Sequence, residues 1–72
     1  MNIVECRSSS TYPERPLALT WEGERLEILA ILSRRRTPEG YWFRVRTRDL
    51  QTFDLTFLEA GDRWKIRPIQ EV

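Results

Sequence analysis

The amino-acid sequence predicts an all-β fold, a small and strongly bent antiparallel barrel of five strands. Three observations support this prediction. The chain has 72 residues, which suits one domain near the lower size limit for unaided folding. Turn-forming residues recur about every eight to twelve positions, a spacing typical of sandwiches and small barrels. Most segments between these turns alternate apolar and polar residues, as half-buried strands do.

The N-terminal segment is expected to lie outside the barrel. We predict an arm or an extra edge strand for residues 1–14 and a β-barrel domain for residues 15–72. The stretch Ser8–Thr11 is rich in hydroxyl side chains and is typical of a flexible connector. Pro13 and Pro16 then bracket a loop that leads into the first barrel strand.

No segment of the sequence suits a membrane or a secretory route. The longest uncharged apolar run, Ile28–Leu32, is far too short to span a bilayer. The first residues lack the basic start and long apolar stretch of a signal peptide. We therefore expect a cytoplasmic protein with no membrane partner. Cys6 is the only cysteine, and we interpret it as a small buried hydrophobe rather than a reactive thiol.

The first two barrel strands flank a glycine turn. Strand 17–21 alternates large and small residues, and Gly23 follows as a residue that tolerates positive φ. The next segment, 24–36, is ambiguous because it is rich in the helix formers Glu, Leu, Ala and Arg. A helix there would make the fold α+β. Its alternating apolar residues favour a strand over about 25–34, and apolar residues on both faces suit a sheet that curls onto itself.

The next predicted strand, 41–48, follows a turn in which Pro38 and Gly40 occupy positions that type I turns favour. Its two faces differ, because one is apolar and the other is basic with a single tryptophan. The first face carries Tyr41, Phe43, Val45 and Thr47, and the second carries Trp42, Arg44, Arg46 and Arg48.

Strands 52–58 and 63–67 complete the barrel. If the two strands of the 41–58 hairpin share a core face, then Arg44 or Arg46 must lie opposite Asp54. Such a cross-strand ion pair contributes about 0.2–1 kcal/mol. The predicted core consists of Leu19, Trp21, Leu26, Ile28, Phe43, Val45, Phe53, Leu55, Phe57, Trp64 and Ile66.

The residue types needed for catalysis are scarce. The chain has no histidine and one cysteine, so histidine-dependent catalytic triads, histidine-based zinc sites and thiolate metal clusters cannot form. Its three glycines are isolated and form no phosphate-binding loop. We therefore expect a non-enzymatic protein without a metal or other cofactor.

The remaining constellation is a group of arginines around one aromatic residue. Eleven of the twelve basic residues are arginine, although the net charge is only +1. Arginines interleaved with an aromatic platform are typical of surfaces that bind single-stranded nucleic acid, and a solvated strand face with paired charges is the alternative. The candidate nucleic-acid-binding residues are Arg34, Arg35, Arg36, Trp42, Arg44, Arg46 and Arg48.

A protein-binding adaptor is the second functional hypothesis. Small β barrels can offer a strand edge or an aromatic groove to a peptide. On this hypothesis the candidate contacts are Ile3, Tyr12, Tyr41 and Trp42.

Three segments carry a resemblance to a known group of proteins. "RPLALTWEGERLEI", "YWFRVRTRDLQTFDLTF" and "RWKI" resemble short, uncharacterised bacterial β proteins with an SH3-like barrel. They also resemble the C-terminal module of inactive Y-family polymerase-like proteins of error-prone DNA repair. The resemblance spans about residues 15–67 and implies an SH3-like fold and a DNA-repair protein as partner. The chain departs from the pattern at Leu26, at Arg34–Arg36, around Asp49–Leu50 and at Ile66, and no catalytic residue carries over.

Overall fold

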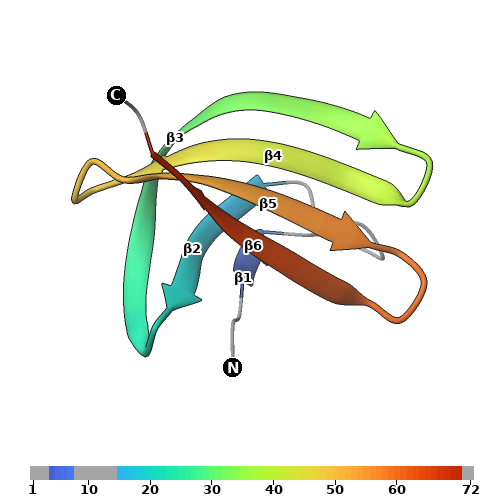
Figure 1. Cartoon of the computed structure of the whole chain (residues 1–72), viewed down its shortest axis with the longest axis horizontal. Helices are drawn as coiled ribbons and strands as arrows, with labels where there is room; N and C mark the ends of the chain where they lie inside the picture. The colour runs from blue at the N-terminus through green and yellow to red at the C-terminus, as the bar shows by residue number, and fades with distance from the viewer. Residues whose placement is uncertain (1–3, 8–14, 71–72) are drawn as a thin grey trace.

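The fold is a single antiparallel sheet of six strands, curled into a half-barrel. The computed structural model describes residues 4–7 and 15–70, and the order of the strands in the sheet follows their order in the chain (Figure 1). The strands are β1 (Val4–Arg7), β2 (Arg15–Trp21), β3 (Glu24–Thr37), β4 (Gly40–Thr47), β5 (Thr52–Leu58) and β6 (Arg63–Ile69). The all-β prediction is confirmed.

The sheet has six strands where the barrel was predicted to have five, because a further strand lies at its N-terminal edge. β1 pairs antiparallel with β2, with Val4 opposite Leu19 and Glu5 opposite Ala18. Of the two forms predicted for the N-terminal segment, β1 is the extra edge strand. Residues 1–3 and 8–14 lie outside the described residues.

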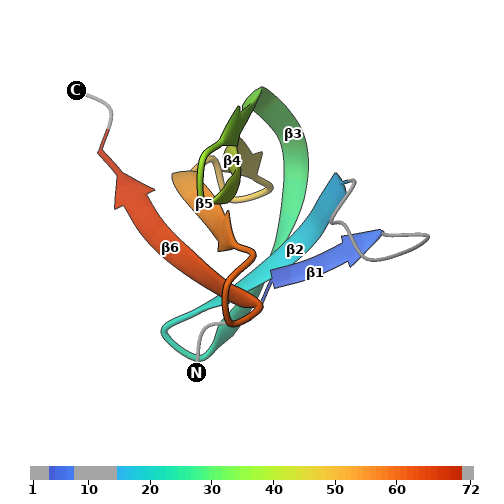
Figure 2. The same ribbon diagram turned by 90° about the vertical axis from the view of Figure 1, so that its right-hand side faces the viewer.

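The prediction of a strand over residues 24–36 is confirmed, and this strand curls the sheet. β2 pairs with only the first part of β3, from Glu24 to Glu27, whereas β4 pairs with the part from Ile28 to Thr37. The register with β4 shifts at two bulges, between Ile28 and Ala30 and between Ile31 and Ser33. Because bulges bend a strand and increase its twist, β3 can pair with β2 in one half of the molecule and with β4 in the other (Figure 2). These pairings outweigh the helix propensity of its residues.

Two short turns fix the hairpins on either side of β3. Glu22 and Gly23 have φ values of 50° and 83°, as the two central residues of a type I′ hairpin turn require. At the other end, Gly40 faces Thr37 across a two-residue loop, and its amide donates to Thr37 Oγ1 at 3.0 Å. The turn residues predicted from the sequence therefore occur where the chain reverses.

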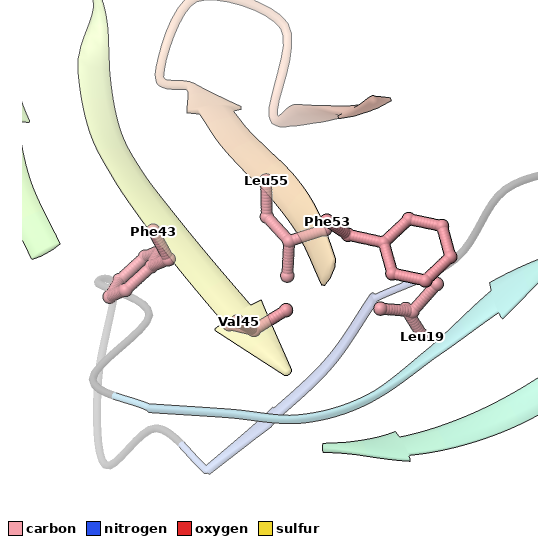
Figure 3. Packing of buried hydrophobic residues seen from close by; sticks show 5 residues of the cluster. All are labelled: Leu19, Phe43, Val45, Phe53 and Leu55. Carbon is pink, nitrogen blue, oxygen red and sulfur yellow. The ribbon is translucent and has the colours of Figure 1, made fainter. Parts of the chain in front are cut away.

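The hydrophobic core lies on the concave side of the sheet. The five residues at its centre come from β2, β4 and β5 and are shown in Figure 3: Leu19, Phe43, Val45, Phe53 and Leu55. Around them pack partly buried residues from β1, β2, β3, β4 and β6, namely Val4, Trp21, Leu26, Ile28, Ile31, Tyr41, Trp64 and Ile66. Phe57 is also buried. Every residue of the predicted core is therefore buried or packed against the core.

Ion pairs cover the opposite side of β1, β2 and β3. Arg25 donates to both carboxylate oxygens of Glu5, at 2.7 and 3.2 Å, and lies 3.7 Å from Glu27. These hydrogen bonds lower the pKa of the Glu5 carboxyl. Ala18 of β2 lies between Glu5 of β1 and Glu27 of β3 in the register. Its position beneath these ion-paired side chains explains why it is completely buried. The sequence did not predict this burial.

Candidate nucleic-acid interface

The run of three arginines, Arg34 to Arg36, does not form one patch. Arg35 lies opposite Trp42 in the register between β3 and β4, whereas Arg34 lies opposite Phe43 and Arg36 opposite Tyr41. Phe43 is buried in the core, so Arg34 and Arg36 belong to the concave side and Arg35 to the convex side. The alternation of a strand thus divides the run between two faces.

Arg36 is engaged at the tips of two hairpins. Its guanidinium donates to Tyr41 Oη at 2.7 Å and lies 5.1 Å from the centroid of the tyrosine ring. It also forms an ion pair with Glu59 at 3.7 Å. A backbone hydrogen bond of 2.9 Å from Glu59 to Glu39 joins the same two hairpins. These contacts give Arg36 a structural role.

Trp42 is half-buried on the convex side of β4. The guanidinium groups of Arg35 and Arg44 each lie 5.4 Å from the centroid of its ring, within the range of cation–π attraction. The presence of a tryptophan on the outer face is thus explained in part by its two arginine neighbours. A ligand that approaches this ring either stacks on one of the two guanidinium groups or moves it aside to reach the ring.

The predicted ion pair across the hairpin is confirmed for Arg44. Arg44 lies opposite Asp54 in the register between β4 and β5. Its Nε and Nη2 donate to the two carboxylate oxygens at 2.8 and 3.1 Å, the bidentate geometry that arginine favours. This pair largely neutralises the charge of Asp54, whose side chain is only 16% exposed. Arg46, two residues further along β4, is half-buried and lies opposite Thr52.

Arg48 lies beyond the end of β4 and faces the other half of the molecule. Its Nε lies 2.7 Å from a carboxylate oxygen of Glu27, and its backbone amide donates to the Glu27 carbonyl at 3.0 Å. Arg48 therefore extends the ion pairs that cover β1 to β3. The structure does not bring it to the face that carries Trp42.

Three basic residues of β6 lie on the convex face but were not among the candidates from the sequence. Arg63, Lys65 and Arg67 are exposed and lie opposite Leu58, Thr56 and Asp54 of β5. They make no ion pair or side-chain hydrogen bond with any residue that the structure describes. Their alternation with Trp64 and Ile66 was visible in the sequence, but their neighbours became known only from the register.

Together, these residues form what we call the cationic outer face, on the convex side of β3 to β6. Six of its side chains are basic and only one is acidic. The face consists of Arg35, Trp42, Arg44, Arg46, Asp54, Thr56, Arg63, Lys65 and Arg67. Because the whole chain has a net charge of only +1, this separation of charge is a property of the fold rather than of the composition.

Other kinds of site find little support in the described residues. Burial raises the pKa of the Cys6 thiol to about 11, so it is protonated at neutral pH and is a poor nucleophile. Among residues 4–7 and 15–70, no group of acidic or sulfur ligands could hold a metal ion. The same part of the chain contains no helix suited to crossing a membrane.

Comparisons with known proteins add no information about this face. No family model, curated protein or solved structure gives a significant match to the chain.

Proposed function

We propose that this protein is a non-enzymatic module that binds nucleic acid through the cationic outer face. The observation that carries the proposal is the gathering of six basic side chains around Trp42, with a single carboxylate among them that Arg44 already pairs. Such a surface attracts phosphates irrespective of base sequence. Guanidinium groups and a tryptophan add stacking partners for bases.

Two finer parts of the proposal rest on the resemblance of residues 15–67. One is that the half-barrel is related to SH3-like barrels. The other is that the module acts beside a DNA-repair protein. Neither part is needed for the proposal that the cationic outer face attracts phosphates, which depends only on the positions of the side chains.

A salt series tests the proposed function. Binding of a fluorescently labelled single-stranded oligonucleotide, followed by anisotropy, should show a log–log slope of affinity against salt of about −2 to −3. This value corresponds to three or four phosphate contacts at about −0.7 each. We expect no more, because the Arg44 charge is shared with Asp54.

The same measurement can contradict the proposal. Sequence-independent binding typically has a dissociation constant of about 10⁻⁴–10⁻⁶ M at physiological salt. If the folded protein shows no binding in that range even at low salt, the cationic outer face is a solvated surface and the proposed function is wrong.

A peptide-binding adaptor is the second candidate, and one observation favours it. Leu29 and Leu32, which the register skips at the two bulges of β3, are 55% and 47% exposed. Exposed apolar residues on a bulged strand could contact an added peptide strand. Of the contacts expected from the sequence, Tyr41 is packed against the core, and Ile3 and Tyr12 lie outside the described residues. Capture of such a partner should be insensitive to salt.

A further inference from the structure

The basic residues of the cationic outer face are not equally available to a ligand. On β4, Arg44 is held by Asp54 and lies over Trp42, and Arg46 is half-buried. On β6, Arg63, Lys65 and Arg67 are exposed and have no ion pair with a described residue. We call these three the β6 column. An incoming phosphate therefore breaks no ion pair between described residues there, so the β6 column is the stronger phosphate site.

The spacing of the β6 column suits one nucleic-acid strand. Alternate residues of a strand lie about 6.7 Å apart, a distance of the same order as that between neighbouring phosphates along a single backbone. Arg63, Lys65 and Arg67 occupy three successive outward positions of β6. The column can therefore contact consecutive phosphates of one strand that runs along β6.

The strip between the β6 column and Trp42 is suited to bases rather than phosphates. It is formed by β5, whose outward residues are Asp54, Thr56 and Leu58. Asp54 is neutralised by Arg44, and the other two carry no charge. β6 and β4 are two strand spacings apart, or about 10 Å, which is comparable to the reach of a nucleotide from its phosphate across its base.

Arg35 and Trp42 lie at the far side of this strip. In the register, Trp42 lies opposite Thr56, and Thr56 lies opposite Lys65. Arg35 is exposed and lies over the Trp42 ring, and it makes no ion pair or side-chain hydrogen bond with a described residue. Its guanidinium can thus stack on a base, or move aside for one, without breaking an ion pair.

We propose that the ligand is a single strand whose backbone follows the β6 column and whose bases cross β5 to stack at Arg35 and Trp42. This inference rests on the proposed function and specifies its ligand and binding mode. A duplex fits the arrangement poorly, because its bases are paired and stacked and cannot offer a ring to Trp42. The residues that bind phosphates are then mainly those of β6 rather than the arginines of β3 and β4.

The test compares two triple variants with equal loss of charge. The first is Arg63→Gln/Lys65→Gln/Arg67→Gln. The control, Arg15→Gln/Arg25→Gln/Arg48→Gln, removes three charges on β2, on β3 and beyond the end of β4. With labelled oligothymidylate, the salt slope of the first variant should be smaller in magnitude than that of the wild type by about 2. This is the expected effect of losing three phosphate contacts that contribute about 0.7 each. The control should keep the wild-type slope.

Tryptophan emission gives a second and independent readout. Trp42 is the tryptophan of the outer face, whereas Trp21 and Trp64 pack against the core. Unlabelled oligothymidylate should quench the emission of the wild type, and Trp42→Phe should abolish that quenching. A duplex of oligothymidylate with oligoadenylate should bind more weakly and leave the emission unchanged.

The possible results separate this inference from the proposed function. The proposal that the backbone follows the β6 column is wrong if the salt slope decreases equally in both triple variants. It is also wrong if only Arg35→Gln and Arg46→Gln decrease the slope. Binding of nucleic acid would stand in either case. Equal binding and quenching by the duplex would overturn the preference for a single strand. If the wild type binds neither ligand, the proposed function fails, and this inference fails with it.

Discussion

Replacement of Leu55 by alanine should leave the protein largely unfolded at room temperature. Leu55 is completely buried and lies in the middle of β5, between Phe43 of β4 and Ile66 of β6. Truncation of such a side chain removes its burial and leaves a cavity, at a cost of about 2–5 kcal/mol. A domain of this size has a total stability of only about 5 kcal/mol, so the loss is comparable to the whole.

Urea denaturation followed by tryptophan fluorescence measures this effect. Leu50→Ala is the matched control, because Leu50 is 72% exposed in the turn after β4, and surface substitutions usually change stability by less than about 0.5 kcal/mol. A loss below about 1 kcal/mol for Leu55→Ala, far under the usual cost for a core residue, would mean that the side chain faces solvent. The inward and outward faces of β5 would then be exchanged.

Gly40→Ala should destabilise the fold by about 3 kcal/mol or more, the upper end of the usual cost of overpacking. A β-carbon at Gly40 would lie 2.0 Å from the backbone oxygen of Phe57 and 3.3 Å from the backbone nitrogen of Glu59. These atoms belong to β5 and the turn after it, so no flexible side chain can move to make room. Relief of the clash requires separation of β4 from β5 next to Phe57.

The matched control for Gly40 is Gly23→Ala. Gly23 also has a positive φ, of 83°, but no atom lies within 4 Å of a β-carbon built there. Its substitution carries only the cost of the left-handed backbone conformation, about 1–2 kcal/mol. Thermal or urea unfolding of the two variants should therefore rank Gly40→Ala as clearly less stable. Equal losses would show that the clash at Gly40 is relieved without cost.

Most of the fold could be predicted from local patterns, because the period-two alternation and the turn residues agree with each other. Strand β5 occurs at the predicted residues 52–58, and each remaining barrel strand begins and ends within three residues of its predicted limits. Prediction was weakest in β3, where the bulges shift the alternation. As a result, Ile31 packs against the core while Leu32 is exposed, an exchange of faces that no periodic pattern indicates.

The candidate site was less predictable because it depends on which strands are neighbours. The sequence showed that Arg44 or Arg46 should face Asp54, since a hairpin fixes its own register, and Arg44 does so. It did not show that Arg36 and Arg48 are engaged by Glu59 and Glu27, since those acidic residues are far away in the chain. For the same reason, the three basic residues of β6 could be assigned to this face only from the pairing of β5 with β6.

Amide and indole chemical shifts of the ¹⁵N-labelled protein, followed on addition of oligothymidylate at low salt, show which face of the sheet binds nucleic acid. We expect perturbations of residues 41–46, 54–58 and 63–67, together with the Trp42 indole, while the indoles of Trp21 and Trp64 and the amides of residues 24–27 stay unchanged. Perturbations confined to β1, β2 and the first part of β3, or none at all at a concentration that saturates binding, would contradict the assignment of the cationic outer face as the nucleic-acid interface.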